Sequence, residues 1–508
     1  MIVFRHHQRW TTLGALRCDR ASYECALADH QWRQIEADDW PGEGEIAAVD
    51  DSTVVRLPEP EGLRFYALWG EGFGRAARRW RAMHPEPCWG LGLRTMGSLL
   101  LPQIELDRAS SVRPVGPSGE RRIAATARLR RELACWPGRF LVVDEGPGLS
   151  GSSLAAAVRL LREAGVARER ITLLASWRPA GAQLSCAYAA RGWDQWQVLV
   201  ADGLPPPGAD AEDIGGGEWR RAFGWNVPVW AQHERRKFLT RHGRTVAKFA
   251  GMGAYGEATW RRAEALARAG FGPPLAPGAR EASRQGWLLA ERVAAAPVAV
   301  SRAFVEFAAR YLAWVRGEFA LGPASEPTTE LRAMAETNIA ELAGGAAAME
   351  PPLGAPVALD GRMLEPEWGA SGAEFVKFDA TDHGDDPFFP GPADIAWDLA
   401  AFVVEFGQEA GSAVLRRYRA LTGEREADVR RRVQWHQAAY CAFRAAFCDL
   451  AARQTSGGDS AGFARLARFY GANLVNVLPG GCAKVKVLGA GNGRLRTMPL
   501  ELTCSRRV

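Results

Sequence analysis

The sequence predicts a mostly parallel α/β domain followed by a second, mixed α+β domain. In the first half, short apolar segments alternate with helical periodicities, a pattern typical of βαβ units. A stretch rich in glycine and proline covers residues 203–217, and beyond it a hairpin pattern precedes a helix and another apolar strand. At 508 residues the chain is too long for one ordinary hydrophobic core, so we expect at least two domains.

The composition of the chain argues against several classes of function. Apolar residues make up 47% and charged residues 24%, as in globular proteins, and a net charge of +5 is small for this length, which argues against a dedicated nucleic-acid binder. The nine cysteines show no CxxC spacing, so neither a zinc site nor a disulfide framework is indicated. No signal-peptide pattern and no apolar run of membrane-spanning length occurs, so we expect a cytoplasmic protein that binds small molecules and no membrane.

The strongest local pattern lies at residues 140–154. Four apolar residues, 140–143, predict a buried parallel strand, and Asp144 and Glu145 follow at its carboxyl end, where an open α/β sheet presents its ligand site. A glycine- and serine-rich loop then opens a helix, and its free N–H groups and the positive end of the helix dipole favour a phosphate. The loop residues are Ser150, Gly151, Ser152 and Ser153.

Other elements of the predicted first domain surround this pattern. Residues up to about 62 are interpreted as an irregular cap. Strands are then predicted at 64–69, from 88, at 110–115 and at 171–177, with a basic amphipathic helix ending near residue 83.

The segment from Asp144 to Ser153 resembles the phosphoribosyl-diphosphate motif of type I phosphoribosyltransferases, although the acidic pair lies one residue further from the loop than is usual, or else Gly146 replaces the second acid. The resemblance implies that the acidic pair and the loop bind phosphoribosyl diphosphate. It also implies a diphosphate loop carrying Arg94 and Thr95, and a mobile flap following Arg113 and carrying Arg121. An ordinary strand–loop–helix with a glycine-rich turn is the alternative.

The second half opens with a hairpin whose second strand carries Lys248, followed by a helix with Glu257 and Glu264 and by an apolar strand. This order resembles the N-lobe of the kinase fold, and the strand that ends near Val293 is similar to the hinge of aminoglycoside phosphotransferases. The resemblance implies that Lys248 holds the α- and β-phosphates of ATP and pairs with Glu264. Backbone groups from position 290 through Glu291 to Val293 would then receive the adenine. A surface lysine at a strand end is the alternative for Lys248.

Three later segments resemble parts of the C-lobe of the same family. Residues 357–365 resemble the catalytic loop, and residues 374–379 resemble the strand that ends in the metal-binding aspartate. Residues 391–400 resemble the Gly-Asp-Pro-x-x-Asp-Leu-Ala stretch, in which the later aspartate, here Asp398, braces the catalytic loop. The resemblance implies Asp360 as base and Asp379 with Glu365 as Mg²⁺ ligands. The usual histidine and asparagine of the catalytic loop are absent. Asp360 could therefore be an ordinary turn aspartate. A dense polar run at 382–386 suits a metal site or a plain loop equally well.

Together these patterns predict an α/β phosphoribosyltransferase-like parallel-sheet domain (63–202) joined by a linker (203–217) to an α+β bilobal kinase-like domain (218–508). The N-lobe would cover about 235–293 and the C-lobe about 294–508. We expect an ATP- and Mg²⁺-dependent transferase that phosphorylates a small hydroxylated metabolite and also binds phosphoribosyl diphosphate or ribose 5-phosphate. The alternative is a nucleotide or phosphate sensor in which one or both domains bind without turnover.

Overall fold

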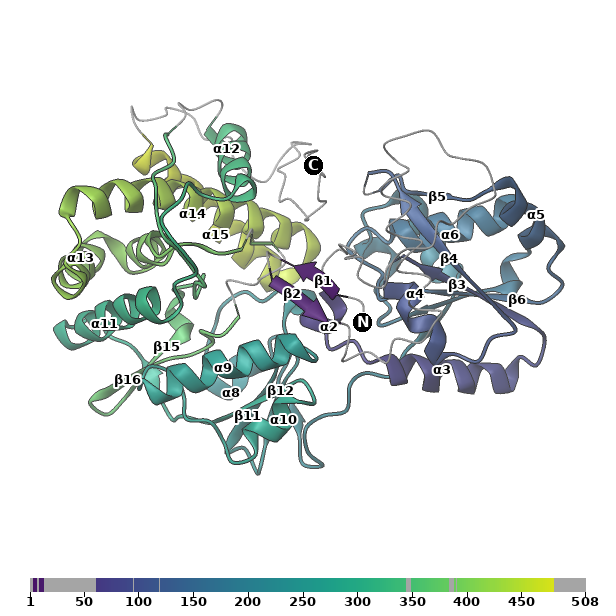
Figure 1. The fold of residues 1–508 in the computed structure, drawn as a ribbon, viewed down its shortest axis with the longest axis horizontal. Coiled ribbons are helices and arrows are strands. Elements are labelled where there is room, and N and C mark those ends of the chain that lie inside the picture. The colour runs from purple at the N-terminus through teal and green to yellow at the C-terminus, as the bar shows by residue number, and fades with distance from the viewer. Residues whose placement is uncertain are drawn as a thin grey trace. The chain divides into compact units, whose positions relative to one another are not determined.

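The computed structural model describes residues 3–6, 9–12 and 61–478, apart from residues 95, 118, 344–348, 383–387 and 390. It divides into two compact units, one of Met1–Pro206 with Met252–Ala254 and one of Pro207–Gly251 with Tyr255–Val508 (Figure 1). A small antiparallel hairpin, β1 (Val3–His6) and β2 (Arg9–Thr12), falls within the segment interpreted as a cap. No helix in the part of the chain that the structure describes has both the length and the apolar character needed to cross a bilayer.

The first unit contains a six-stranded, mostly parallel sheet in the order β5-β4-β3-β6-β7-β8, in which only β5 runs antiparallel to its neighbour. This confirms the α/β prediction for this half. The strands are β3 (Cys88–Leu93), β4 (Arg108–Val115), β5 (Arg122–Ala124), β6 (Arg139–Val143), β7 (Ile171–Ala175) and β8 (Gln197–Val200).

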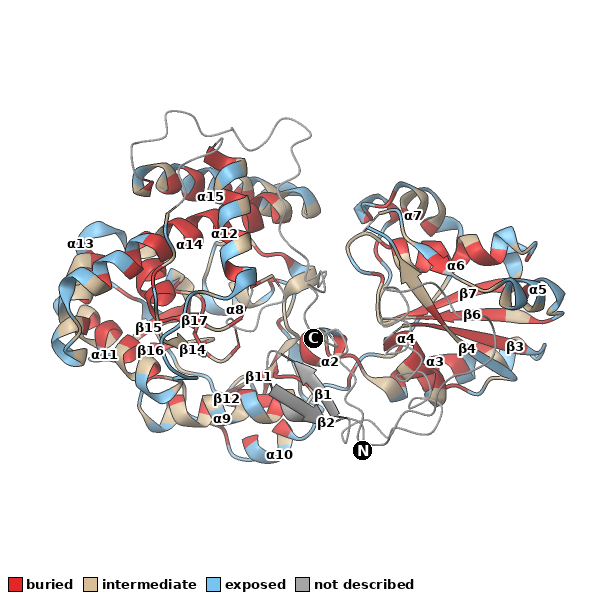
Figure 2. Ribbon diagram, turned by 45° about the horizontal axis from the view of Figure 1, so that its top comes forward, coloured by how far each residue is buried: buried red, intermediate tan, exposed pale blue. Residues whose placement is uncertain are grey.

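Helices cover both faces of this sheet (Figure 2). Along β6, Phe140 and Val142 pack in one apolar cluster and Leu141 and Val143 in another, as the period of two of a strand requires. The first cluster includes residues of α5 (Ala127–Cys135), α6 (Ser152–Glu163) and α7 (Ala187–Gly192), and the second includes residues of α3 (Gly70–Met83) and α4 (Met96–Leu100). Both faces of β6 are therefore buried, which explains its uninterrupted apolar sequence.

The strand predicted at 64–69 is wrong. Residues 61–64 form a short helix, α2 (Glu61–Arg64), and the following residues turn, with the amides of Phe65 and Leu68 donating to the carbonyls of Glu61 and Gly62 at 2.7 and 2.9 Å. Phe65, Ala67 and Leu68 are buried in that turn, so their burial required no strand.

The second unit begins with a four-stranded antiparallel sheet in the order β12-β11-β10-β9. The predicted hairpin is present as β10 (Lys237–Thr240) and β11 (Thr245–Phe249), followed by α9 (Ala254–Arg268), α10 (Ala279–Ser283) and β12 (Trp287–Glu291). The edge strand β9 (Glu212–Asp213) lies inside the segment predicted as a linker, and α8 (Trp219–Phe223) follows it. The segment 203–217 therefore contributes a strand to this sheet.

The rest of the second unit is largely helical, with small two- and three-stranded sheets between the helices. Its helices are α11 (Arg302–Glu318), α12 (Thr329–Ala343), α13 (Ala396–Thr422), α14 (Glu426–Gln454) and α15 (Gly457–Val477). Its short strands are β13 (Ala296–Pro297), β14 (Pro356–Val357), β15 (Trp368–Ser371), β16 (Glu374–Lys377) and β17 (Ala393–Asp394).

Single 3₁₀ turns occur in both units. Those of the first unit, η2 to η5, occupy Leu101–Gln103, Arg168–Arg170, Gly181–Gln183 and Trp193–Gln195, and those of the second, η6 and η7, occupy Ala231–His233 and Glu365–Glu367.

Candidate functional sites

The loop after β6 in the first unit has the form expected of an anion site. Gly151 is the N-cap of α6 with a φ of +66°, a left-handed conformation that suits glycine. The hydroxyls of Ser150 and Ser152 lie 2.8 Å apart, and the Ser152 amide donates to the Ser150 hydroxyl at 3.2 Å. The loop is therefore ordered around the first turn of α6, whose leading N–H groups lack partners within the helix.

Asp144 and Glu145 lie directly before this loop in a partly buried position. The Asp144 carboxylate accepts the Glu145 amide at 3.0 Å, and the Glu145 carboxylate accepts the Gly62 amide at 2.9 Å. Burial raises the pKa of Asp144 to about 7, although the Glu145 amide and Arg121 act in the opposite direction. Burial, together with the charges of Asp144 and Glu61, raises the pKa of Glu145 well above its ordinary value. A hydroxyl donor or a cation beside either carboxylate would therefore stabilise its ionised form.

The structure brings one flap arginine to the loop. Arg121 donates to the Ser153 hydroxyl at 2.6 Å, which places it at the first turn of α6. Arg94 donates to the Ser111 hydroxyl at 2.7 Å, so its side chain lies beside β4. Arg113 lies on β4 and is half-buried, and Thr95 lies outside the described residues.

The turn after β3 packs closely against the loop region. A Cβ added to Gly97 would lie 2.0 Å from the Val143 carbonyl and 3.2 Å from the Asp144 Cα. Only glycine permits this approach. The predicted diphosphate turn and the acidic pair are therefore neighbours.

In the second unit, Lys248 on β11 lies between two carboxylates. Its ammonium forms an ion pair with Asp379 and another with Asp382 at 2.7 Å, and Arg235 binds the second oxygen of Asp382 at 2.6 Å. Asp379 comes two residues after the end of β16 and has a φ of +55°. A left-handed backbone is uncommon outside glycine, and such strain concentrates at functional sites.

The strand register adds another cation to this cluster. Lys237 on β10 is directly opposite Lys248 on β11, so the two side chains share one face of the sheet. Burial alone would lower the pKa of Lys237, but Glu234, Asp379 and Asp382 raise it above its ordinary value. Three cations and two aspartates therefore gather at this end of the hairpin.

The predicted Lys248–Glu264 pair is wrong. Glu264 instead pairs with Arg268 at 3.0 Å, on a partly exposed side of α9. The charged residue of α9 that contacts the site region is Arg262, whose Nε donates to the Ala380 carbonyl at 2.7 Å and whose Nη1 donates to the Ala358 carbonyl at 2.6 Å. Its guanidinium also lies 4.2 Å from the centre of the Phe319 ring. Arg262 therefore joins α9 to the segments that carry Asp379 and Asp360.

Asp360 lies in a buried network. Its carboxylate has no exposed surface, accepts the Tyr311 hydroxyl at 2.6 Å and pairs with the Lys377 ammonium at 2.9 Å. The expected bracing by Asp398 is confirmed, because its carboxylate accepts the amides of Asp360 and Gly361 at 3.1 and 2.9 Å. With no exposed oxygen, Asp360 lacks geometric support for the base role predicted for it.

The remaining predicted residues lie apart from these bonds. Glu365 is exposed at the start of η7, whereas Glu367, at its end, is buried and accepts from Lys377 at 3.2 Å. Glu291 is exposed at the end of β12, and Val293 is half-buried just beyond it. Among the described residues no group of three potential metal ligands occurs, so a cation at the Lys248 cluster would have two aspartates to bind.

Sequence reasoning assigned no role to Arg262, Lys237 and Arg235. Arg262 falls in the stripe of residues 259, 262, 263 and 266, whose other members are buried, and this period marks the inward face of α9. Lys237 was readable from the register of the hairpin. Arg235 has no comparable sequence signal.

Comparisons with known proteins give only remote likenesses. No family model matches the chain, and no curated protein matches it. Among solved structures, a choline/ethanolamine kinase family protein from Mesorhizobium loti is 17% identical over 54% of this chain and 93% of its own, with a TM-score of 0.30.

Two further structures give similar values. A macrolide 2'-phosphotransferase type I is 14% identical over 46% of this chain and 87% of its own, with a TM-score of 0.31. A glucosamine kinase in complex with glucosamine, ADP and inorganic phosphate is 10% identical over 48% and 78%, with a TM-score of 0.33.

The raised pKa of Asp144 predicts a pH-dependent stability. In the unfolded chain this carboxyl ionises near 3.8 and in the folded chain near 7, so the folded state binds the extra proton and loses stability as pH rises between these values. Asp144→Asn should therefore be more stable than wild type at pH 8 by at most about 4 kcal/mol, and nearly equal to it at pH 4. Thermal melts across this range test it, and parallel pH profiles for the two proteins would contradict it.

Arg262→Met should loosen the two segments that Arg262 holds. Loss of two partly buried hydrogen bonds should raise backbone hydrogen exchange at residues 358–362 and 378–382 by roughly tenfold. Arg261→Met is the matched control, because Arg261 is exposed and pairs with Glu257 on the same helix. Equal exchange in the two variants would show that Arg262 does not position these segments.

Proposed function

We propose that the second unit is a phosphotransferase that moves the terminal phosphoryl group of a nucleoside triphosphate to a small hydroxylated acceptor. The observation that carries this proposal is Lys248 placed between Asp379 and Asp382, with Asp379 in a left-handed conformation beyond a strand. Phosphoryl transfer needs positioning and charge neutralisation more than covalent chemistry, and this cluster offers both signs of charge.

The donor set suits a Mg²⁺ ion carried by a nucleotide. Mg²⁺ in such sites takes one or two carboxylates, with phosphate oxygens and waters completing its shell, so Asp379 and Asp382 would be sufficient. When bound, the ion would neutralise charge on the transferring phosphoryl group. Lys248, Lys237 and Arg235 would bind phosphate oxygens.

The connection between β9 and β10 provides a candidate cover for the phosphates. It runs from Ile214 to Arg236, with Gly215, Gly216 and Gly217 near its start, and Glu234 and Arg235 near its end lie beside the Lys248 cluster. Two of these glycines have positive φ values, +60° and +94°, so the backbone here takes conformations that side chains disfavour. Main-chain groups at residues 290–293, at the end of β12 and just after it, would receive the base.

A second candidate function is a nucleotide sensor that binds without turnover. The observation in its favour is the burial of Asp360, whose carboxylate is engaged by Tyr311 and Lys377. Gly361, the residue after Asp360, has no side chain. The next residue, Arg362, is a cation and cannot accept a proton from an alcohol. Nucleotide binding without product formation would support this candidate.

For the first unit we propose a site for phosphoribosyl diphosphate or ribose 5-phosphate. The loop of Ser150 to Ser153 would bind phosphate, Asp144 and Glu145 would accept ribose hydroxyls, and Arg121 would balance the phosphate charge. The contact of Arg121 with Ser153 supports this arrangement, because it brings a cation to the loop. Arg94, just after β3, and Arg113, on β4, would bind the diphosphate.

Asp379→Asn should reduce nucleotide-dependent phosphorylation by about a thousandfold or more, because an amide cannot supply the anionic oxygen that Mg²⁺ requires. Glu374→Gln, the same change at an exposed position on β16, should leave the rate unchanged. ADP formation and product mass measure the rate, and MgATP-dependent thermal stabilisation measures binding. Wild-type activity in the Asn variant, or a wild-type protein that does not respond to MgATP, would rule out the phosphotransferase proposal.

Ser150→Asp should abolish the thermal stabilisation that phosphoribosyl diphosphate gives the wild-type protein. The added carboxylate would repel the phosphate, and a ligand stabilises a protein only in proportion to its binding. Ser371→Asp, at the exposed end of β15 in the second unit, controls for the added charge. A full shift in the Ser150 variant would place the phosphate elsewhere.

A further inference from the structure

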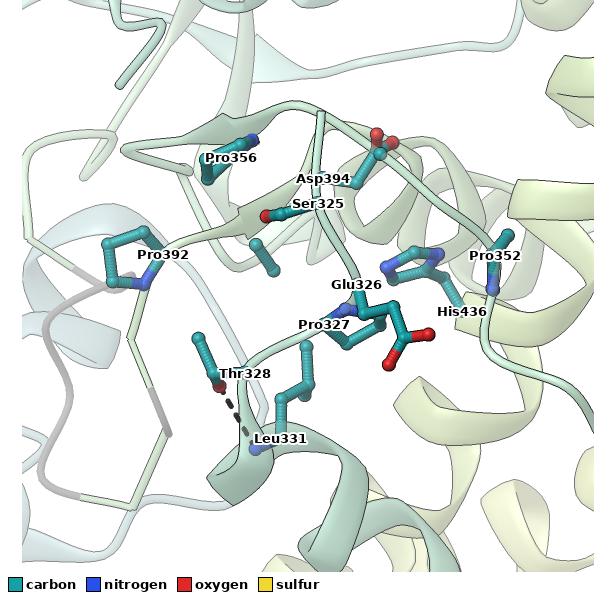
Figure 3. Close-up of a pocket in the computed structure, with 12 residues that line it drawn as sticks. Ser325, Glu326, Pro327, Thr328, Leu331, Pro352, Pro356, Pro392, Asp394 and His436 are labelled. Atoms are coloured by element: carbon teal, nitrogen blue, oxygen red, sulfur yellow. Dashed lines mark hydrogen bonds between the residues drawn. The ribbon is translucent and has the colours of Figure 1, made fainter. Parts of the chain in front are cut away.

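A small cavity of about 30 Å³ lies in the second unit, between the segment that precedes α12, the strands β14 and β17, and helix α14 (Figure 3). This volume holds one or two groups of the size of a water molecule. None of the residues that line it belongs to the Lys248 cluster. Its polar lining consists of Ser325, Glu326, Thr328, Asp394 and His436.

His436 gives the cavity a buried hydrogen-bond acceptor. Only 1% of the residue is exposed, and its Nδ1 lies 2.8 Å from the Arg432 carbonyl one turn earlier on α14. Because a carbonyl can only accept, Nδ1 must carry the hydrogen. Burial lowers the pKa of the imidazole, so the ring is neutral and Nε2 holds a lone pair.

The Nε2 atom has no hydrogen-bond partner within the described part of the chain. It is on the side of the ring opposite Nδ1, so it points away from the Arg432 carbonyl, and His436 lines the cavity (Figure 3). A buried acceptor without a partner costs about 1–3 kcal/mol. A donor that entered the cavity would recover this free energy.

The other polar groups also favour a donor. The buried Asp394 is already balanced by Arg432, whose Nη1 lies 2.8 Å from each of its oxygens. The Glu326 carboxylate lies at the exposed rim, 3.8 Å from Nη1 of Arg332, so it can receive a further donor. The Thr328 hydroxyl accepts the Leu331 amide at 3.2 Å. No lysine or arginine is among the residues that line the cavity, and Arg432, behind Asp394, is already paired with it, so an anion would find no unpaired cation there.

The walls are held in place before any ligand arrives. Ser325 and Gly354 exchange two backbone hydrogen bonds, of 2.9 and 3.0 Å, and β14 pairs with β17. A Cβ on Gly354 would lie 2.0 Å from an oxygen of Asp394, so this glycine permits the close approach of the two segments. Four prolines, at positions 327, 352, 356 and 392, complete the lining and add stiffness. Such a preformed site loses little entropy on binding.

We propose that this cavity binds the primary ammonium group of a small organic amine. Its N–H donors would bind Nε2 of His436 and a Glu326 oxygen, and its charge would be balanced by Glu326. A quaternary ammonium carries the charge but no donor, and a neutral alcohol carries a donor but no charge, so the site should discriminate against both. The proposal is independent of the phosphotransferase proposal, because the two sites share no residue.

Ethanolamine is the probe, with ethylene glycol and tetramethylammonium chloride as controls at matched ionic strength. Ethanolamine should raise the melting temperature of the full chain saturably, by about 1–3 °C, and the two controls should not. His436→Phe, which keeps the ring volume but removes the acceptor, should lose the shift. Glu326→Gln should weaken ethanolamine binding several-fold, and Glu330→Gln, which changes an exposed glutamate of α12 outside the cavity, should bind as wild type does.

A second measurement does not depend on the stability of the variants. In the wild-type protein labelled with ¹⁵N-histidine, the Nε2 resonance of His436 should move as ethanolamine is added, because the nitrogen gains a hydrogen bond. Absence of a saturable response to ethanolamine, an equal response to either control compound, or an unchanged response in a folded His436→Phe variant would each overturn the proposal.

Discussion

The position of the loop after β14 depends on one carboxylate, that of Asp398, which accepts the backbone amides of Asp360 and Gly361 from the first turn of α13. The loop held in this way presents the Asp360 side chain to Tyr311 on α11 and to Lys377 on β16. Lys377 precedes Asp379 by only two residues. The buried bonds of Asp398 and Asp360 therefore also determine where Asp379 lies, and with it the partner of Lys248.

The network of Asp360, Asp398 and Lys377 buries charged groups, which costs solvation free energy. Burial raises the pKa of Asp398 to about 7, and the charge of Asp360 adds to the effect. Burial would lower the pKa of Lys377, but Asp360 and Glu367 raise it above its ordinary value. Buried ion pairs add little net stability against apolar replacements, yet removing one partner costs about 3–5 kcal/mol. The contribution of the network is therefore to fix the direction of a strand end.

Elements with strong periodicity could be predicted from the sequence. Residues 140–143 and the following helix satisfied two separate patterns, buried strand and amphipathic helix, and both are present. The strand predicted at 64–69 failed because an apolar run of this length also suits a buried turn. The order of lysine strand, helix and aspartate strand was also readable, but the pairing of their side chains was not.

The prediction of side-chain pairs failed where the direction of a side chain, and not its spacing in the sequence, decides its partner. Glu264 and Arg262 are two residues apart on α9, so their side chains point to nearly opposite sides, and the family resemblance selected the wrong one. Asp360 failed in a similar way, because a loop of unknown register gives no sign of which side chain is buried. Asp382 lies in a polar run whose composition fits a loop as well as a site, and only the fold places it beside Lys248.

Each aspartate of the cluster around Lys248 already has a cationic partner, and this would couple the binding of a metal ion to that of a nucleotide. Lys248 and Arg235 already satisfy Asp379 and Asp382. A free nucleotide would draw the cations away and leave the aspartates unbalanced, and a free divalent ion would do the reverse. A metal–nucleotide complex exchanges both sets of partners at once. The two components should therefore bind with positive coupling, each raising the affinity of the cluster for the other.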